Sequence, residues 1–425
     1  MNKPEELCRL AKQASLKTAV LPHEVRRAAL KKMAAALSEH RDLILKANLE
    51  DRQRAADENL SPVLIKRLLI DEKKLEDMAA GLLSLARLPD PLGRKTLKRE
   101  LDQGLILTRR TVPIGLVGVI FEARPEALVQ IAGLCAKSGN ALLAKGGREA
   151  EASNGVLHRV LREAQIGTSP DWENGFLLLH TREEINAILS MDEYIDLLIP
   201  RGSNQLVRHI LDHTKIPVMG HAAGICAMYV DKTYDREKSL RLIRDGKTQY
   251  PAVCNAIETL LVHRESADIL PRLLEIMPEV EIRGCGETQK IISCLPASSC
   301  DWETEYNDLI LSVKIVETLQ EAIDHINAHG SRHTDVILTE DKKAAEEFLN
   351  RVDSSSVMWN CSSRFADGYR YGFGAEVGIA TGKIHARGPV GLEGLCIYKY
   401  ILEGNGHIVD DYARGLKSFT HRDLI

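Results

Sequence analysis

The sequence predicts an α/β protein with two doubly wound α/β domains and a small β element. Three features predict it. Helical patterns fill residues 1 to 88, apolar β runs then alternate with helical segments in two successive series, and short alternating segments lie before the first series and near the C-terminus. With 425 residues, the chain is also too long for one ordinary core.

The first 88 residues repeat apolar positions at three and four residue spacing, as in "VRRAALKKMAAALSEHRDLILKANLEDRQRAA". That spacing places the apolar side chains on one face of a helix. The following stretch "SPVLIKRLLIDEKKLEDMAAGLLSLARL" begins with a Ser cap at Ser61 and with Pro62 at the first helical position. Pro89 and Pro91 end this region, so we expect helices up to that point.

The segment "LKRELDQGLILTRRTVPIG" alternates apolar and charged residues on both sides of Asp102-Gln103-Gly104. This pattern predicts a hairpin with a solvent-exposed face, and edge hairpins of this kind often pair with another chain. The tail "LCIYKYILEGNGHIV" alternates in the same way, with a turn at Asn405-Gly406. We expect a strand pair there, extending beyond the second domain.

Two series of apolar runs follow the hairpin. We expect strands of a first parallel sheet at "IGLVGVIF", "ALLAK", "GFLLL", "IDLLIP" and "ICAMYVD". A second series begins at Cys254, with strands at "ETLLVH", "VEIRG", "LILSVKIV", "TDVILT" and "SSVMWN" and helices at "ADILPRLLEI", "LQEAIDHINAH" and "KKAAEEFLN". The second series predicts another α/β domain of similar build.

Composition excludes several classes of protein. Lys and Arg total 56 against 60 Asp and Glu, and the net charge of −4 is not gathered in blocks, which argues against nucleic acid as a partner. The N-terminal segment mixes charges into a helical pattern, and "IGLVGVIF" is too short to span a bilayer, so we expect a soluble, cytoplasmic protein without a membrane partner. Nine cysteines without a CxxC pair fit neither a disulfide framework nor a zinc ribbon.

Two strand-to-helix turns are candidates for binding a nucleotide, although no GxGxxG motif follows a strand in the first series. "LLAKGGREA" contains Lys145, and "LIPRGSNQLV" contains Arg201, Gly202 and Ser203. At such turns the unpaired amides of a helix N-terminus can hold phosphate or ribose oxygens, and a cation adds charge. An ordinary βα turn that needs glycine for its geometry explains either turn equally well.

Histidine pairs lie at i and i+4 spacing in "RHILDH" and "HINAHGSRH", namely His209 with His213 and His325 with His329. This is the spacing of a two-histidine metal face. No Glu lies between the members of either pair, and no third ligand is evident. We therefore interpret both pairs as solvated surface histidines and predict no metal.

Cys254 lies in "QYPAVCNAIETLLVH", between a proline-marked extended run and an expected first turn of a helix. An exposed thiol has a pKa of ~8.5 and is a poor nucleophile at neutral pH. A helix N-terminus favours the thiolate, and its amides can stabilise an oxyanion. Among nine cysteines a structural role is the commoner one, so these residues alone leave Cys254 open as a buried thiol or as a nucleophile.

Four motifs in order carry a resemblance to a known family: "PIGLVGVIFEARPEALVQIAGLCAKSGNALLAKGGREA", "YPAVCNAIETLLVH", "HGSRHTDVILT" and "SRFADGYRYGFGAEVGIATGKIHARGPVGLEGL". The chain resembles the gamma-glutamyl phosphate reductases, also called glutamate-5-semialdehyde dehydrogenases, of the aldehyde dehydrogenase superfamily. The resemblance runs from about residue 5 to about residue 415. It implies an NADP-binding domain at 1–96 and 113–225, a catalytic domain at 226–395, and an oligomerisation element at 97–112 and 396–425.

The resemblance assigns roles to individual residues. Cys254 matches the nucleophile of the superfamily, and Lys145 matches the lysine that reaches the adenosine ribose or its phosphate. Gly202 and Ser203 match the glycine and serine of the helix beside the pyrophosphate, and Glu305 matches the glutamate on the nicotinamide ribose. The superfamily binds its dinucleotide without the usual fingerprint, which accounts for the missing GxGxxG motif.

Two departures from the hydrolytic aldehyde dehydrogenases point to an acyl phosphate. Those enzymes have a glutamate that activates water where "GHAAGICAMYVD" has Gly220 or His221. They also have an oxyanion asparagine where "VGVIFEARPE" has Ala123 or Arg124. A thioester formed from an acyl phosphate needs no water activation, and a cation near the phosphoryl group is favourable. Arg124 is our candidate for that cation.

The resemblance implies NADPH-dependent reduction of L-glutamyl 5-phosphate to L-glutamate 5-semialdehyde through a cysteine thioester, the second step of proline biosynthesis. The carboxylate and ammonium of the substrate need a bidentate cation and an acidic or carbonyl acceptor. Candidates in two C-terminal loops are Arg364, Glu376, His385 and Arg387, with the two arginines assigned to carboxylate or phosphate. Salt bridges between domains would explain the same residues equally well.

The resemblance also implies partners, namely a homo-oligomer and possible handover of the unstable acyl phosphate from a glutamate 5-kinase. Two alternatives remain open. One is a hydrolytic, phosphate-independent semialdehyde dehydrogenase, which the missing glutamate near residue 220 disfavours. The other is a noncatalytic nucleotide-binding protein or scaffold, which the presence of Cys254, Lys145 and Glu305 disfavours.

Overall fold

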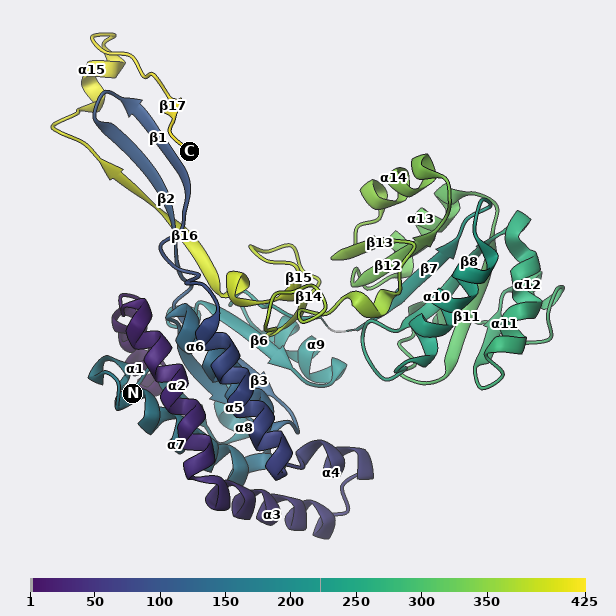
Figure 1. The fold of residues 1–425 in the computed structure, drawn as a ribbon, viewed down its shortest axis with the longest axis horizontal. Helices are drawn as coiled ribbons and strands as arrows, with labels where there is room; N and C mark the ends of the chain where they lie inside the picture. The colour runs from purple at the N-terminus through teal and green to yellow at the C-terminus, as the bar shows by residue number, and fades with distance from the viewer. Residues whose placement is uncertain (1–2, 222) are drawn as a thin grey trace. The chain divides into compact units, whose positions relative to one another are not determined.

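The computed structural model describes residues 3–221 and 223–425 (Figure 1). The chain divides into two compact units. The first unit contains Met1–Val218 together with Gly391–Ile425, and the second contains Met219–Val390. The predicted hairpin and C-terminal strand therefore belong to the first unit, and each unit is described by itself below.

The N-terminal region is helical, as predicted. Its helices are α1 (Lys3–Thr18), α2 (His23–Glu39), α3 (Arg41–Asp57), α4 (Pro62–Leu68) and α5 (Glu72–Arg87). Ser61 caps α4 by accepting a hydrogen bond from the amide of Leu64, as expected. The long stretch after Ser61 is nevertheless two helices, because Asp71 caps α5 through the amide of Lys74 at 2.8 Å. Among the described helices, none has both the length and the apolar character that a membrane span requires.

The first unit contains a parallel sheet of four strands in the order β5-β4-β3-β6. The strands are β3 (Leu116–Phe121), β4 (Ala141–Lys145), β5 (Phe176–Leu179) and β6 (Leu197–Arg201), and the helices between and after them are α6 (Pro125–Ser138), α7 (Glu151–Ile166), α8 (Arg182–Ile188) and α9 (Asn204–His213). Leu116, Leu143 and Leu198 form one core with Cys8 of α1 and Ile210 of α9. Four of the five expected runs are thus strands of one sheet with helical crossovers, the doubly wound arrangement.

The second unit contains a parallel sheet of seven strands in the order β10-β9-β11-β8-β7-β12-β13. The strands are β7 (Cys226–Val230), β8 (Ile257–His263), β9 (Glu281–Gly284), β10 (Leu295–Pro296), β11 (Ile310–Val316), β12 (Thr334–Leu338) and β13 (Ser356–Trp359), and the main helices are α10 (Arg236–Thr248), α11 (Leu270–Ile276), α12 (Gly286–Gln289), α13 (Leu319–His329) and α14 (Lys342–Arg351). Met228 packs in the core that contains Leu240 of α10, whereas Tyr229 packs in the core that contains Ile323 of α13 and Phe348 of α14. Successive side chains of β7 therefore point to opposite faces, and helices cover both faces (Figure 1).

The assignment of "ICAMYVD" to the first series of strands is wrong. The structure places β7 in the sheet of the second unit, between β8 and β12. All five residues of β7 are buried. A strand buried on both faces is an uninterrupted apolar run, and such a run carries no information about which sheet it joins.

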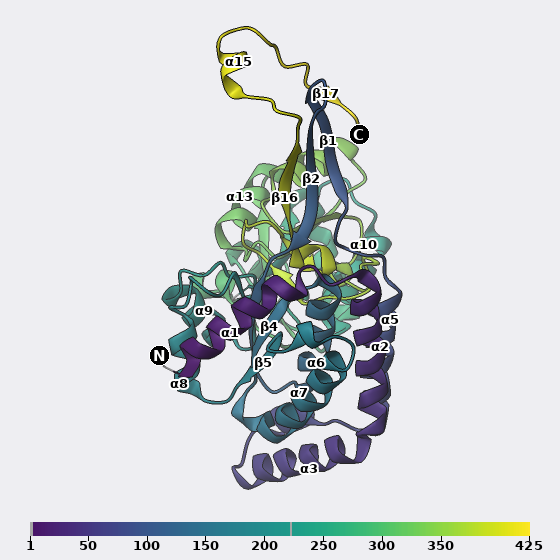
Figure 2. The same ribbon diagram turned by 90° about the vertical axis from the view of Figure 1, so that its left-hand side faces the viewer.

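The predicted hairpin is present as β1 (Lys95–Asp102) and β2 (Leu105–Pro113), joined through Gly104 at φ 76°. The tail strand β16 (Cys396–Glu403) pairs with β2 rather than with residues beyond Asn405-Gly406, so the expected tail hairpin is wrong. The chain instead forms α15 (Val409–Ala413) and returns as β17 (Arg422–Asp423) beside β1. The resulting antiparallel sheet, in the order β16-β2-β1-β17, extends away from the parallel sheet of its unit (Figures 1 and 2).

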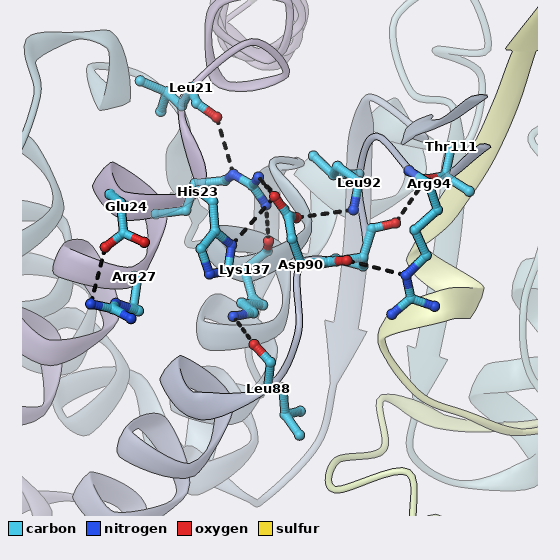
Figure 3. Close-up of polar contacts among 12 residues, drawn as sticks. Leu21, His23, Glu24, Arg27, Leu88, Asp90, Leu92, Arg94, Thr111 and Lys137 are labelled. Carbon is cyan, nitrogen blue, oxygen red and sulfur yellow. Dashed lines mark hydrogen bonds and ion pairs between the residues drawn. The ribbon is translucent and has the colours of Figure 1, made fainter.

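A polar network fixes the segment that leads into the hairpin (Figure 3). Arg26 of α2 is 2% exposed and donates to both carboxylate oxygens of Asp90, at 3.0 and 2.8 Å. It also donates to the carbonyl of Lys137 in α6 at 2.5 Å, and the Nζ of Lys137 donates to the carbonyl of Leu88. Burial lowers the pKa of Lys137 to about 8. The network therefore joins the segment before the hairpin to two helices.

Candidate active site

Cys254 lies in a turn of the second unit, between the end of α10 and the start of β8. The expectation of a helix N-terminus at this cysteine is wrong. The amide of Ala256 donates to the carbonyl of Val253 at 3.0 Å, and β8 begins at Ile257 with all of its residues buried. The local pattern after Cys254 is that of a core strand, so the chain does not begin a helix at the thiol.

Contacts from several segments fix the turn. A Cβ atom at Gly224 would lie only 2.6 Å from the Cβ of Cys254, so glycine is required for this close approach. The thiol of Cys226 donates to the carbonyl of Cys254 at 3.1 Å. On the other side, Ser363 donates to the carbonyl of Asn255 at 2.7 Å. Cys254 is half-buried, whereas burial raises the pKa of Cys226 well above its usual range. Cys254 is thus a positioned, partly accessible thiol.

Two imidazoles lie beside Cys254. One ring nitrogen of His221, one of His333 and the Sγ of Cys254 all lie within 4.8 Å of one another, and the two rings meet edge to face at 5.0 Å. The Nδ1 of His221 donates to the carbonyl of Ile379 at 2.8 Å, which in the neutral ring leaves the lone pair on Nε2. Burial, reinforced by His221, lowers the pKa of His333 well below its usual range.

Sequence reasoning missed this cluster. The sequence pattern points to His221 or Gly220 only as the residue at the place of a missing glutamate, and it indicates no role for His333. The one available signal was the motif "HGSRHTDVILT", which contains His333. The three residues are far apart in the chain, and only the adjacency of β7, β8 and β12 brings them together.

Among the predicted substrate residues, Arg364 interacts electrostatically with Cys254. Its side chain is buried, and its Nε donates to the Oε1 of Gln249 at 3.0 Å. Burial is the main cause that lowers its pKa, Arg370 lowers it further, and Cys254 partly offsets this shift. A desolvated cation therefore accompanies the thiol within the second unit.

The other predicted substrate residues lie in loops of the second unit. Arg387 donates to the carboxylate of Asp353 at 2.9 Å and to its carbonyl at 3.0 Å, and its Nε donates to the carbonyl of Thr381. This salt bridge lies within one unit, which favours a structural role over a substrate contact for Arg387. Glu376 accepts from the amide of Gly368 at 2.8 Å, and His385 is exposed.

Glu305 lies in a loop that a buried ion pair joins to β8. The side chains of Lys247 and Glu258 are fully buried, and the Nζ of Lys247 lies 2.5 Å from the Oε2 of Glu258. The amide of Asn307 donates to the Oε1 of Glu258 at 3.3 Å. Burial raises the pKa of Glu258 to about 7, and the charge of Glu305 contributes to the same shift. The strand that follows Cys254 therefore also anchors the loop of Glu305.

The predicted phosphate cradle lies in the first unit, at the N-terminus of α9. Ser203 caps the helix by accepting from the amide of Leu206 at 3.4 Å. The amide of Ser203 donates at 2.7 Å to the carboxylate of Glu122, and a Cβ at Gly202 would lie 2.5 Å from that same carboxylate. The backbone of the turn thus binds the carboxylate of Glu122. The same backbone groups fit a pyrophosphate when Glu122 moves away.

The remaining predicted residues of the first unit occupy two other turns. Lys145 ends β4, is 5% exposed and donates to the carbonyl of Gly146, and burial lowers its pKa. Arg124 is exposed and directly precedes α6, after Ala123 with an unusual φ of 43°. A shallow hollow next to Lys145 is lined by residues that include Gly146, Gly147 and Arg148.

The interpretation of both histidine pairs as surface residues is correct only in part. His209 and His213 are exposed on α9. His325 is 7% exposed, its ring packs edge-on against Trp302 with centroids 5.4 Å apart, and burial lowers its pKa to about 3. Among the described residues, the group of three that could hold a metal ion is His221, Cys254 and His333 instead.

Comparisons with known proteins show the family of the chain. The family model described as "Aldehyde dehydrogenase family" matches residues 2–284. A gamma-glutamyl phosphate reductase of Acetivibrio thermocellus is 54% identical over 424 residues, which are 99% of this chain and 98% of that protein. One of Methanosarcina mazei is 51% identical, over 97% of this chain and 96% of the relative.

Solved structures show the same relationship. The crystal structure of gamma-glutamyl phosphate reductase from Thermotoga maritima has a TM-score of 0.93 and 36% identity, covering 96% of this chain and all of that one. An acetylating aldehyde dehydrogenase from Geobacillus thermoglucosidasius, at 15% identity and a TM-score of 0.64, shares the fold over 96% of this chain and 97% of its own.

The chain is therefore an oxidoreductase of the aldehyde dehydrogenase family. Within that family, it belongs to the gamma-glutamyl phosphate reductases.

Proposed function

We propose that this protein reduces L-glutamyl 5-phosphate to L-glutamate 5-semialdehyde and phosphate, with NADPH as reductant and Cys254 as nucleophile. The single observation that carries the proposal is the half-buried Cys254 thiol, fixed in a turn beside His221 and the Arg364 cation. A positioned thiol with a base beside it and a cation in its electrostatic environment suits attack on an anionic acyl phosphate. The names of the relatives supply the substrate, a gamma-glutamyl phosphate, and the place in the proline pathway rests on the family resemblance.

The chemistry follows from these side chains. The Nε2 of His221 accepts the proton of Cys254, the sulfur attacks the acyl carbon, and the carbon–oxygen bond to phosphate breaks with release of phosphate. NADPH, when bound, would supply the hydride that reduces this thioester. The C–S bond of the thiohemiacetal then breaks, the aldehyde leaves, and the sulfur recovers its proton from His221. His333 stays neutral because it is fully buried.

Four of the predicted residues are our candidates for holding the cofactor. Gly202 and Ser203 would bind the pyrophosphate on the backbone that now holds Glu122, and Glu305 would bind the nicotinamide ribose. The preference for NADPH over NADH rests on Lys145 and on Arg148, which is exposed three residues later, because a 2′-phosphate needs a nearby cation.

The substrate would use a subset of the predicted residues. We assign Arg364 to the carboxylate or phosphate of the substrate, because its buried guanidinium interacts electrostatically with Cys254 and donates through Nε to a neutral acceptor, Gln249. Glu376 is proposed for the ammonium group, and Arg124 for the phosphoryl group. His385 and Arg387 are weaker candidates, since Arg387 is held by Asp353.

Replacing Cys254 tests the proposal directly. The variant Cys254→Ala should lose turnover by at least about a thousandfold, because it removes the sulfur on which the proposed thioester forms. NADPH binding, followed by the fluorescence of the cofactor, should remain within about twofold of the parent. The matched control is Cys300→Ala, which removes an exposed thiol and should leave turnover unchanged. Substantial activity in Cys254→Ala would remove this residue from the mechanism.

A further inference from the structure

The side chains around Cys254 have the composition of a metal site as well as of a catalytic one. A thiolate and two imidazoles are the ligands of three-residue zinc sites. In a tetrahedral site with Zn–S near 2.3 Å and Zn–N near 2.0 Å, ligand atoms lie roughly 3.3 to 3.6 Å apart. The three ligand atoms here lie within 4.8 Å of one another. Side-chain rotations that move these atoms by about 1 Å would bring them to the distances of a tetrahedral site.

Both imidazoles have a polar contact at Nδ1 that fixes the orientation of the ring. His221 donates through Nδ1 to the carbonyl of Ile379 at 2.8 Å, the arrangement that normally fixes the tautomer of a metal-binding histidine. The Nδ1 of His333 is 2.9 Å from the hydroxyl of Thr334. Its Nε2 is buried and makes no hydrogen bond to any residue within the described ranges. That fully buried nitrogen is the second observation that points to a ligand.

We propose that Cys254, His221 and His333 bind a borderline-soft divalent cation, with Zn²⁺ as the preferred ion. Zn²⁺ takes thiolate and imidazole ligands in tetrahedral geometry, whereas Mg²⁺ and Ca²⁺ prefer oxygen ligands. Three protein ligands leave a fourth position open for water. Binding replaces the thiol proton of Cys254 by the metal, so one proton leaves to solvent for each ion bound.

The consequence for activity rests on the proposed function. A cation on the sulfur of Cys254 removes the lone pair that attacks the acyl carbon, so Zn²⁺ would inhibit the enzyme reversibly and a chelator would restore it. Metal binding itself does not require that Cys254 be the nucleophile. The two claims therefore need separate measurements.

Cobalt(II) is the direct probe for binding, because it takes zinc sites and reports a thiolate ligand by charge-transfer absorption in the near ultraviolet. The full-length protein, reduced and free of metal, should gain this absorption at one Co²⁺ per chain and lose it on addition of Zn²⁺. The variant Cys254→Ser should lack the band. The variant His221→Asn keeps a donor for the carbonyl of Ile379 but loses the ring nitrogen, and it should bind Co²⁺ at least tenfold more weakly.

A control variant separates this site from adventitious binding. His213→Ala disrupts the exposed His209 and His213 pair on α9, which can bind cobalt but offers no thiolate, and it should leave the charge-transfer band unchanged. The proposal is overturned if the parent protein shows no band, if the band survives in Cys254→Ser, or if His221→Asn binds as tightly as the parent. A cobalt band in a protein without reductase activity would instead uphold the metal site and refute the proposed function.

Discussion

At the scale of single residues, the close approach at Gly224 controls the position of the thiol. An added Cβ at this glycine would meet the Cα, the carbonyl and the Cβ of Cys254, and backbone atoms cannot yield as the end of a flexible side chain can. The functional geometry of Cys254 therefore depends on a residue that has no side chain.

We expect Gly224→Ala to lower kcat at least about tenfold, because the turn of Cys254 must shift and a displacement of 1 Å is costly in catalysis. The rate of alkylation of Cys254 by iodoacetamide should change in parallel. The control is Gly81→Ala in α5, where an added Cβ meets no atom within 4 Å. Parent-like turnover of Gly224→Ala would show that the close approach is not needed.

Asp335 makes stability depend on pH. It is fully buried, it accepts from the amide of Ala227 and from Ser354, and burial raises its pKa from 3.8 to about 7. A raised carboxyl pKa contributes stability that is complete below the unfolded value and is lost as pH rises through the folded value. This contribution should therefore decline between about pH 4 and pH 7, by at most about 1.4 kcal/mol per pH unit.

Asp335→Asn should remove that dependence, because the amide keeps both hydrogen bonds and has no charge to bury. Denaturant unfolding at several pH values gives the test. The stability of the variant relative to the parent should increase from pH 5 to pH 7. An unchanged difference across that range would show that Asp335 does not titrate there.

The carboxylate of Glu122 should compete with cofactor phosphate at the N-terminus of α9. We expect Glu122→Gln to bind NADPH about three- to tenfold more tightly, since the neutral amide no longer repels the pyrophosphate. Fluorescence titration measures the Kd, with the exposed Glu173→Gln as control. Weaker binding in Glu122→Gln would mean that this carboxylate supports the cofactor site instead.

At the scale of elements, the antiparallel sheet of the first unit has large exposed apolar side chains on one of its edge strands. β16 is the terminal strand of that sheet, and its side chains Tyr398, Tyr400 and Leu402 are each more than half exposed and point to one face. Large apolar side chains on an edge strand are typical of pairing between chains. This is the feature that supports the predicted oligomerisation element.

The variant Tyr400→Glu combined with Leu402→Glu should convert the oligomer to a smaller species, because it places two charges on that face. Light scattering during size-exclusion chromatography gives the mass. Leu49→Glu makes a matched change at an exposed leucine of α3 and should leave the mass unaltered. A parent that is already monomeric at micromolar concentration would contradict the predicted oligomer.

Local sequence patterns predicted the helices and strands better than they predicted which strands pair with one another. The hairpin about Gly104 and the Ser61 cap depend on adjacent residues, and the sequence was sufficient for them. The helix expected at Cys254 failed because the buried strand β8 begins three residues later. The sheet of β7 and the meeting of His221 with His333 depend on strand order, which no local pattern encodes.

At the scale of the whole molecule, the predicted site residues are divided between the units. Lys145, Gly202 and Ser203 lie in the first unit, and Cys254 and Glu305 lie in the second. Recognition of these roles required resemblance to a family over the full chain, because each residue has an ordinary structural explanation in isolation. The comparisons confirm the family, and the chemistry at Cys254 is the remaining central claim.

The most direct test of that claim runs the reaction backward. The protein is given L-glutamate 5-semialdehyde and NADP⁺, and the initial rate of reduction of NADP⁺ is measured while phosphate is varied from none to saturating. We expect the rate to require phosphate, because phosphate must attack the Cys254 thioester to release the acyl group. An equal rate without phosphate would show that water is the acceptor, and it would contradict the assignment to an acyl phosphate.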